Sequence, residues 1–411
     1  MQPHRTPGNA LPEPHPDSLE HSRHVSASLT AAIDAAGGSI SFGEFMQRAL
    51  YAPGLGYYVA GSRKFGADGD FVTAPEISPL FGQVLAGQCK EVLDSIADGD
   101  ILELGAGSGA LCVQIMQRLS ERDSLPVRYR ILEVSADLRE RQQHRIRAEL
   151  GPLADRVDWL DGVPQGFRGV VVANEVADAL PVERFVIGTN GVLQLRVGLS
   201  AGGFCWQQAA APEWLSAAVA DIEKSIGRSL PPGYTSELSP GLAGWIADIA
   251  GSLQDAFVFL FDYGVSRQEY YAPDRADGWL RCYFRHHAHD DPLLYPGIQD
   301  LTAWVDFTAI AGAASAAGLA VAGYVSQSQF LLHGGLADEL ADFEQLDGVR
   351  QYELSRAVKL LTLPGEMGEH FKCLGLAAGT VALPAAATCL AVTAEITISA
   401  PATASAGLTA A

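Results

Sequence analysis

The stretch DILELGAGSG at residues 100–109 decides the fold that this sequence predicts. Its apolar first half reads as a buried strand, and Gly105, Gly107 and Gly109 then precede a helix pattern over residues 110–119. Glycine lets the backbone turn sharply and a ligand approach closely, while a helix N-terminus offers free N–H groups. The stretch therefore predicts a nucleotide-like ligand at the turn, and a plain strand-to-helix turn is the alternative.

Strand and helix patterns alternate after this turn. Residues 136–150 read as an amphipathic helix that follows the next strand. Alternation of this kind indicates an α/β fold of the Rossmann-like type, with a doubly wound, mostly parallel sheet. Short apolar segments read as the strands at residues 129–134, 157–160, 169–173, 185–197, 204–207, 257–261, 320–324 and 371–376.

Polar side chains stand where three of these strands are expected to end. Glu133 closes the first strand after the turn, Asp161 follows the next, and Asn174 and Glu175 follow the third. In a doubly wound sheet the carboxyl ends of the strands share one edge, where ligands bind. The sequence therefore predicts a binding site at that edge.

Composition changes along the chain indicate how it is divided. The start is rich in Pro and His without the apolar stretch of a signal peptide, and the segment after residue 376 is rich in Ala, Thr and Ser. Residues 57–79 form a long irregular segment of aromatic, glycine and acidic residues, which is typical of a ligand-facing lid or of a surface loop. We expect a disordered lead at 1–17, a helical extension with the lid-like loop at 18–98, a core at 99–376 with an inserted substrate-side subdomain at about 184–255 and 265–300, and a low-complexity tail at 377–411.

The composition indicates a globular and strongly acidic protein. The 411 residues carry a formal net charge of −20, with 48% hydrophobic and 18% charged residues. The negative charge argues against a nucleic-acid partner and favours a cationic one. No apolar run is long enough to cross a bilayer, so membrane insertion is not expected. Six scattered cysteines without a Cys-x-x-Cys pair predict reduced thiols and a cytoplasmic location.

Several stretches together match the pattern of a known protein family. They are GDFVTAPE at 69–76, ELGAGSG at 103–109, ILEVS at 131–135, NEVADALP at 174–181, DYG at 262–264 and PGIQDLTA at 296–303. With them the chain resembles the MidA-type class I S-adenosylmethionine-dependent methyltransferases, a family that includes the mitochondrial complex I assembly arginine methyltransferase. The resemblance covers about residues 42–376.

The resemblance implies S-adenosyl-L-methionine as the cofactor and methyl transfer to nitrogen of a protein side chain, with arginine as the expected acceptor. It also implies a protein partner, for which a respiratory-complex subunit is a candidate. The cofactor-binding residues that follow from it are Thr73, Pro75, Glu76, Glu103, Gly105, Gly107, Gly109, Glu133, Asp161 and Asn174. The catalytic residues that follow from it are Asn174, Glu175, Asp178 and Asp262.

Particular roles on the cofactor side follow from this assignment. The glycine turn would lie near the methionine part of the cofactor, and residues 73–76 would close over it. Glu133 would accept hydrogen bonds from two ribose hydroxyls, because both carboxylate oxygens are acceptors. Asp161 would meet the adenine amine.

The substrate side is expected after the strand that ends at Asn174. A carboxylate pair, Glu175 and Asp178, would hold a planar guanidinium in a fork geometry. Asp262 and Tyr263 are second candidates for the same wall. The structural alternatives are that Asp178 caps a turn and that Asp262 is a turn residue.

Two other functions fit the glycine pattern. Residues 105–110 also satisfy the dinucleotide-binding pattern with Glu133 as the ribose acid, which makes an NAD-dependent oxidoreductase the second candidate. Against it, this acid lies further from the glycines than the usual ~20 residues. A non-catalytic binding or assembly protein with a methyltransferase-like fold is the third candidate.

Three features remain apart from this assignment. The sequence HHAHDD at 286–291 offers possible metal ligands, but its spacing matches no common metal motif, and we expect no metal. Ala177 stands where the family often has a large apolar residue, which predicts a wider or differently shaped substrate pocket. The tail also differs from the family's usual ending, which predicts an altered closing edge of the sheet.

Overall fold

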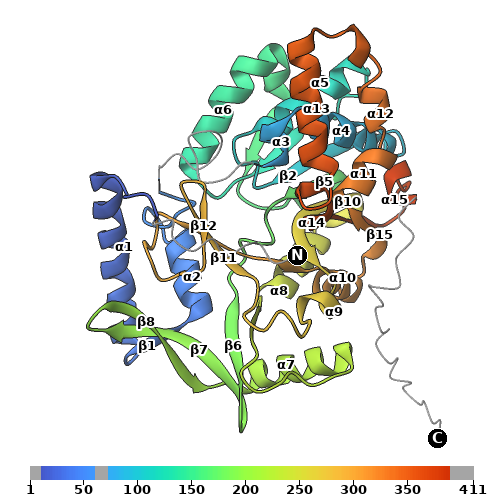
Figure 1. Cartoon of the computed structure of the whole chain (residues 1–411). Helices are drawn as coiled ribbons and strands as arrows, with labels where there is room; N and C mark the ends of the chain where they lie inside the picture. Colours follow the sequence, from blue (N-terminus) through green and yellow to red (C-terminus); the bar gives the residue numbers. More distant parts are fainter. Residues whose placement is uncertain (1–10, 61–72, 389–411) are drawn as a thin grey trace, which may run out of the picture.

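The computed structural model describes residues 11–60 and 73–388. Three parts of the predicted segments lie outside the described residues: 1–10 of the lead, 61–72 of the lid-like loop and 389–411 of the tail. A central mixed sheet carries helices on both faces, and a smaller region of helices and antiparallel strands lies beside it (Figure 1).

The central sheet has the strand order β15-β16-β10-β5-β2-β3-β4, with the short β14 paired to β10. Strands β10, β5, β2, β3 and β4 are parallel, whereas β16 runs antiparallel to both of its neighbours. The predicted doubly wound, mostly parallel α/β sheet is therefore confirmed. The strands are β2 (Asp100–Leu104), β3 (Tyr129–Leu132), β4 (Val157–Leu160), β5 (Phe167–Asn174), β10 (Leu253–Val265), β14 (Val305–Asp306), β15 (Ala320–Ser326) and β16 (Phe371–Ala378).

Apolar side chains on successive residues of each strand enter opposite cores. Val170 and Val172 of β5 join one hydrophobic cluster, and Val171 and Ala173 join the other. Burying each of these valine side chains stabilises the fold by roughly 1.5–3 kcal/mol. The first face is covered by α4 (Leu80–Leu93), α5 (Ala110–Glu121), α6 (Ala136–Leu150), α11 (Gln327–His333), α12 (Leu336–Glu339) and α13 (Gly348–Thr362), and the second by α8 (Leu242–Ala250) and α10 (Phe307–Ala316) (Figure 1).

The strand order changes direction at β2. From β2 the chain crosses through α5 to β3 on one side, whereas β5 pairs with the other side of β2. A crevice forms outside the carboxyl ends of the strands at such a switch point. The fold thus places the end of β2, and the glycines after it, at the mouth of that crevice.

The smaller region combines the N-terminal helices with the segments between β5 and β14. Buried residues of α1 and α2, Val197 of β7 and Leu301 of β13 share one hydrophobic cluster. Figure 1 shows α1 and α2 beside β11 and β7, away from α13. The elements are α1 (Pro16–Ala35), β1 (Ser39–Ser41), α2 (Phe42–Tyr51), β6 (Glu183–Gly188), β7 (Gly191–Ser200), β8 (Gly203–Ala210), α7 (Glu213–Ile226), β9 (Thr235–Leu238), α9 (Arg267–Tyr270), β11 (Leu280–Phe284), β12 (His287–His289) and β13 (Asp300–Ala303).

Some predicted bounds differ from the structure. The strand predicted at 185–197 is a hairpin of β6 and β7, and α8 packs on the main sheet although it lies within the predicted insertion. The predicted tail is ordered at its start, because β16 continues to Ala378 and Ala386 is fully buried in α15 (Ala385–Thr388). Among the described residues, no helix is both long and apolar enough to span a membrane. The remaining short helices are α3 (Ala74–Ile77), α14 (Met367–His370) and two 3-10 helices, Gly151–Arg156 and Phe343–Gln345.

Candidate functional site

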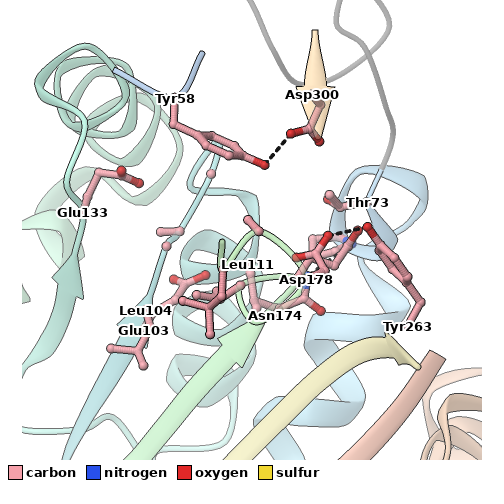
Figure 2. Close-up of a pocket in the computed structure, with 18 of the residues that line it drawn as sticks. Tyr58, Thr73, Glu103, Leu104, Leu111, Glu133, Asn174, Asp178, Tyr263 and Asp300 are labelled. Atoms are coloured by element: carbon pink, nitrogen blue, oxygen red, sulfur yellow. Dashed lines mark hydrogen bonds between the residues drawn. The ribbon is translucent and has the colours of Figure 1, made fainter. Parts of the chain in front are cut away.

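A cavity of about 880 Å³ lies at the carboxyl ends of β2, β3, β5 and β10. The glycine turn, the residues after β3 and the residues after β5 form its inner walls. Tyr51 and Tyr58 from the N-terminal region, Asp300 of β13 and Trp304 complete the opposite side. Residues far apart in the sequence therefore line one cavity (Figure 2).

The glycine turn has the backbone shape that the sequence predicted. Gly105, Gly107 and Gly109 have φ angles of 64°, 53° and 82°, in the left-handed region that glycine adopts without steric cost. Gly109 is also the N-cap of α5, so the helix begins at the cavity. Free N–H groups of a helix start and a close backbone approach both suit a polar ligand.

Glu133 lies just after β3 with its carboxylate held in the cavity wall. Its Oε1 accepts from the backbone N–H of Ser135 at 3.0 Å, and its Oε2 accepts from Nε2 of Gln142 at 2.9 Å. The same Gln142 amide donates to the carbonyl oxygen of Gly107 at 3.0 Å. Gln142, which the sequence interpretation did not single out, therefore fixes Glu133 relative to the glycine turn.

Glu103 lines the cavity beneath the turn and is almost fully buried. The Tyr129 hydroxyl donates to its Oε2 at 2.8 Å. Burial raises the pKa of Glu103 to about 7, although the bond from Tyr129 lowers it. Glu103 therefore changes charge near neutral pH.

The segment around α3 joins the cavity to the glycine turn. Thr73 and Pro75 line the cavity, but Glu76 does not. The Glu76 carboxylate instead accepts from the Ser108 hydroxyl and, at 2.9 Å, from the Arg145 guanidinium of α6. Glu76 is thus placed to position the turn and not to contact a ligand in the cavity.

Asp161 lies apart from the cavity. Its side chain is 93% exposed and pairs with Nη2 of Arg139 at 2.9 Å. The cavity wall near it is apolar and includes Leu132, Val134 and Val163. Contact between Asp161 and an adenine stays a prediction, and it would require the side chain to turn away from Arg139.

Asn174 and Glu175 follow β5 directly at the cavity. Nδ2 of Asn174 donates to Oε1 of Glu175 at 3.1 Å, while Oδ1 of Asn174 is buried with no hydrogen-bond partner among the described residues. Glu175 has a φ of 55°, which costs a residue with a side chain on the order of 1 kcal/mol. Burial, followed by the charge of Asp178, raises the pKa of Glu175 to about 8.

Asp178 and Asp262 lie close together but have different surroundings. Asp178 lines the cavity, where its Oδ2 accepts from the Tyr263 hydroxyl, and burial raises its pKa to about 6. Asp262 is fully buried behind it and does not line the cavity. Its carboxylate accepts from three backbone N–H groups, those of Ala177, Asp178 and Tyr263. Asp262 therefore holds Asp178 in place and has no oxygen turned to the cavity.

Several cavity residues were missed by the sequence interpretation. The Tyr58 hydroxyl donates to Oδ1 of Asp300 at 2.8 Å, and the Tyr51 hydroxyl donates to the carbonyl oxygen of Ala179 at 2.9 Å. Tyr58 lies in the lid-like segment and Asp300 in the stretch PGIQDLTA at 296–303, and the sequence predicted no individual role for either residue. Further lining residues that were missed include Tyr283, Trp304, Glu366 and His370.

The cavity is strongly acidic. Among the described residues, its lining has several carboxylates and neither lysine nor arginine. Each carboxylate opposes ionisation of its neighbours, and a cation in the cavity relieves that repulsion. Three of these carboxylates are Glu175, Asp178 and Asp300. The remaining lining carboxylates are Glu103, Glu133, Asp248 and Glu366.

The histidine-rich stretch lies outside this cavity. His287 and His289 belong to β12, and Arg285 and His286 form its tight turn with positive φ angles. His287 Nδ1 lies 2.7 Å from the carbonyl oxygen of Arg285. Within residues 11–60 and 73–388, no three His, Cys, Asp or Glu side chains gather as a metal site would require.

Comparison with known proteins identifies a family and close structural relatives. Residues 84–325 match a family described as "Putative S-adenosyl-L-methionine-dependent methyltransferase". A crystal structure from Burkholderia thailandensis, bound to S-adenosyl-homocysteine, is 39% identical, covers 92% of this chain and 97% of its own, and has a TM-score of 0.86. A native structure from the same organism is 38% identical, covers 92% of this chain and 97% of its own, and has a TM-score of 0.84.

Curated relatives span most of the chain. "Protein arginine methyltransferase NDUFAF7, mitochondrial" of Danio rerio is 26% identical, covering 85% of each chain. The homologue of Drosophila melanogaster is 29% identical and covers 92% of this chain and 91% of its own. The predicted cytoplasmic location is contradicted, because these relatives are named as mitochondrial proteins. Scattered cysteines indicate reduced thiols, which do not identify a compartment.

Proposed function

The chain belongs to this family of S-adenosyl-L-methionine-dependent methyltransferases, and from that premise we propose that it methylates arginine side chains of a protein substrate. The resemblance to the MidA-type family is confirmed, and with it the enzyme class and the cofactor. The family assignment removes the NAD-dependent oxidoreductase as a candidate. The acceptor, the protein partner and the residue roles are the proposal.

The residues present fit S-adenosyl-L-methionine. When bound, it supplies a methyl group already activated by its sulfonium, so the protein has to align the acceptor and exclude water. Oδ1 of Asn174 is buried without a partner among the described residues and suits a ligand that donates a hydrogen bond, and Glu133 adds a fixed carboxylate for hydroxyl groups. We assign the glycine turn, Glu133, Asn174, Thr73 and Pro75 to cofactor binding.

The acidic cavity is the observation that carries the choice of arginine. A carboxylate pair matches the planar guanidinium of arginine in a fork geometry. Lysine must lose its proton before it can attack. A cavity whose described lining residues include several carboxylates and neither lysine nor arginine favours the charged form of lysine. The curated relatives are themselves named protein arginine methyltransferases, and a respiratory-complex subunit stays the candidate partner.

Glu175 and Asp178 orient the acceptor in this proposal. The acceptor nitrogen loses one proton as its bond to the methyl carbon forms and the sulfur–carbon bond breaks. Asp178, with a pKa of about 6, is mostly ionised at neutral pH and accepts that proton. The hydrogen bond from the Tyr263 hydroxyl keeps the Asp178 carboxylate in place.

Labelled S-adenosyl-L-methionine and a proteome lysate test the proposal, with mass spectrometry to locate the label. We expect labelled methylarginine in one or a few proteins. Asp178→Asn should lower labelling at least about tenfold while S-adenosyl-homocysteine binding is kept, whereas Glu133→Ala should abolish that binding. Label on lysine or carboxylate alone would overturn the arginine assignment, and no label with intact cofactor binding would favour a non-catalytic binding protein.

A further inference from the structure

Asp300 has the position of a substrate ligand although it comes from outside the methyltransferase sheet. It lies in β13, is 2% exposed and lines the cavity. Its Oδ1 accepts the hydroxyl proton of Tyr58, which follows α2. A carboxylate and the tyrosine that orients it thus come from two segments that are 242 residues apart.

The Asp178–Tyr263 pair repeats this arrangement on the core side of the same cavity. Figure 2 shows both hydrogen-bonded pairs, with Asp300 and Asp178 on the side of the cavity away from Glu133. Oδ1 of Asp178 is buried and has no hydrogen-bond partner among the described residues. An unmet acceptor in a cavity wall indicates a ligand that donates hydrogen bonds.

Electrostatic coupling supports the view that both carboxylates face one space. After burial, Asp178 and then Asp300 raise the pKa of Glu175. The pKa values of Tyr58 and Tyr283 are also raised, by burial first and then by the charge of Asp300. A cation between the two aspartates would relieve these repulsions together.

Aromatic side chains lie beside both pairs in the cavity lining. The rings of Tyr51 and Tyr58 stack with centroids 5.5 Å apart on one side. On the other side Trp304 meets Tyr263 edge to face at 6.1 Å. Aromatic faces accept a guanidinium, which is planar and weakly hydrated, better than a compact ammonium.

We propose that Asp300, oriented by Tyr58, is a second substrate carboxylate, so that the acceptor guanidinium is held between the Asp300–Tyr58 and Asp178–Tyr263 pairs. This inference rests on the proposed function and adds the residues that select the acceptor. Asp300 contacts substrate, and Tyr58 is a positioning residue. The N-terminal extension and the insertion therefore supply half of the acceptor site.

A binding experiment tests this without knowledge of the protein substrate. The guanidine probe is a stable cofactor analogue in which nitrogen replaces sulfur and carries a propylguanidine arm. The urea probe is the matched control, in which the arm is an uncharged propylurea of similar shape. Calorimetry on the full chain gives the affinity ratio of the two probes, and S-adenosyl-homocysteine reports on the cofactor half alone. The variants are Asp300→Asn, Tyr58→Phe and, as an exposed control outside the cavity, Glu140→Gln.

Wild-type protein should bind the guanidine probe about tenfold or more tightly than the urea probe, because a charge-assisted pair is the stronger one. Asp300→Asn should remove most of that ratio with unchanged S-adenosyl-homocysteine affinity, Tyr58→Phe should lower it in part, and Glu140→Gln should keep it. A full ratio in Asp300→Asn overturns the inference. If that variant fails to bind S-adenosyl-homocysteine, Tyr58→Phe decides, and an unchanged ratio there overturns it. A ratio near one in the wild type instead refutes the proposed cationic acceptor.

Discussion

Glu175 combines two features that are unfavourable in the absence of a ligand. Its φ of 55° is a conformation that side chains resist, and its pKa of about 8 reflects a carboxyl group that burial and Asp178 keep protonated. Strain of this kind persists where the surrounding structure enforces it, often at functional sites. A cationic acceptor would let Glu175 ionise and relieve the second cost.

Removal of the Glu175 charge should therefore stabilise the ligand-free protein at high pH. The folded pKa of about 8 lies above the ordinary value of 4.5, so the folded protein keeps a proton that the unfolded chain has released between these values. Stability falls as pH rises through this window. We expect Glu175→Gln to melt at least about 2 °C higher, relative to wild type, at pH 8 than at pH 5.

Differential scanning fluorimetry at the two pH values measures this difference. Asp161→Asn serves as the control, because that exposed side chain lies apart from the cavity. Equal melting differences at both pH values would contradict the raised pKa of Glu175.

Asp262 acts through the backbone, which leads to a different expectation. Its carboxylate accepts N–H groups of Ala177, Asp178 and Tyr263, and an asparagine would turn an amide toward some of them. Asp262→Asn should destabilise the protein by about 1–3 kcal/mol in urea unfolding. An unaltered unfolding free energy with lost methyl transfer would instead favour a catalytic role.

Sequence alone could not separate these aspartates. In the sequence, Asp178 and Asp262 both come after expected strands and both belong to family-like motifs, but only their surroundings decide which one reaches the cavity. The same holds for Asp161, whose strand end was located while its side-chain direction was not. The type and order of residues predicted the edge of the sheet, and side-chain packing decided the site.

Among the elements, α3 has an influence that its length does not suggest. Glu76 joins this short helix to Ser108 in the glycine turn and to Arg145 in α6, and Gln114 of α5 donates to the carbonyl oxygen of Pro75 at 2.7 Å. Glu76 thus links the glycine turn to α6, through two partners that lie 32 and 69 residues away from it in the sequence. Such long-range pairs leave no local pattern in the sequence.

Loss of this contact should weaken cofactor binding without a change at the cavity surface. We expect Glu76→Gln to lower S-adenosyl-homocysteine affinity by about 3–10-fold, because it removes one charge-assisted contact near the turn. Glu149→Gln is a matched control, because Glu149 also accepts from Arg145, at 2.9 Å, but does not touch the turn. Calorimetry that finds equal losses in both variants would contradict a specific role of Glu76.

Strand and helix identity was otherwise read well from periodicity. The strands at 129–134, 257–261 and 371–376 were located, with their ends displaced by a few residues. The hairpin of β6 and β7 was read as one strand, although Asn190-Gly191 at its turn is a recognised hairpin signal. The neighbours of each strand could not be predicted, since pairing depends on tertiary contacts.

In our proposal the main sheet forms the cofactor half of the molecule and the smaller region supplies part of the acceptor site, and the two have separate hydrophobic clusters. Phe45 of α2 is fully buried in the cluster beneath Tyr58 and β13, and it meets Phe204 at 5.6 Å. Phe330 of α11 is its counterpart under the main sheet, against Phe261 at 4.9 Å. A substitution that weakens one hydrophobic cluster should therefore reduce ligand binding by its own part of the molecule more than binding by the other part.

Phe45→Ala should cost about 3–5 kcal/mol locally and weaken the guanidine probe more than S-adenosyl-homocysteine. Phe330→Ala should weaken both ligands. Hydrogen exchange measures the effect directly, with α2 and β13 losing protection together in the first variant. Uniform loss across the main sheet in Phe45→Ala would mean that the two halves unfold as one unit.

Strand β16 lies between β10 and β15 although it is the last of the three along the chain. A polypeptide emerging from the ribosome therefore offers the glycine turn and Glu133 well before β10 gains this neighbour. Folding during synthesis starts from the N-terminal side. The cofactor half can form early, but Asp300 and then Phe371 must be made before the acceptor half closes. In the proposed site, a nascent chain that ends before Asp300 lacks one of the two carboxylates that hold the acceptor, so we expect methyl transfer only from chains that extend beyond Asp300.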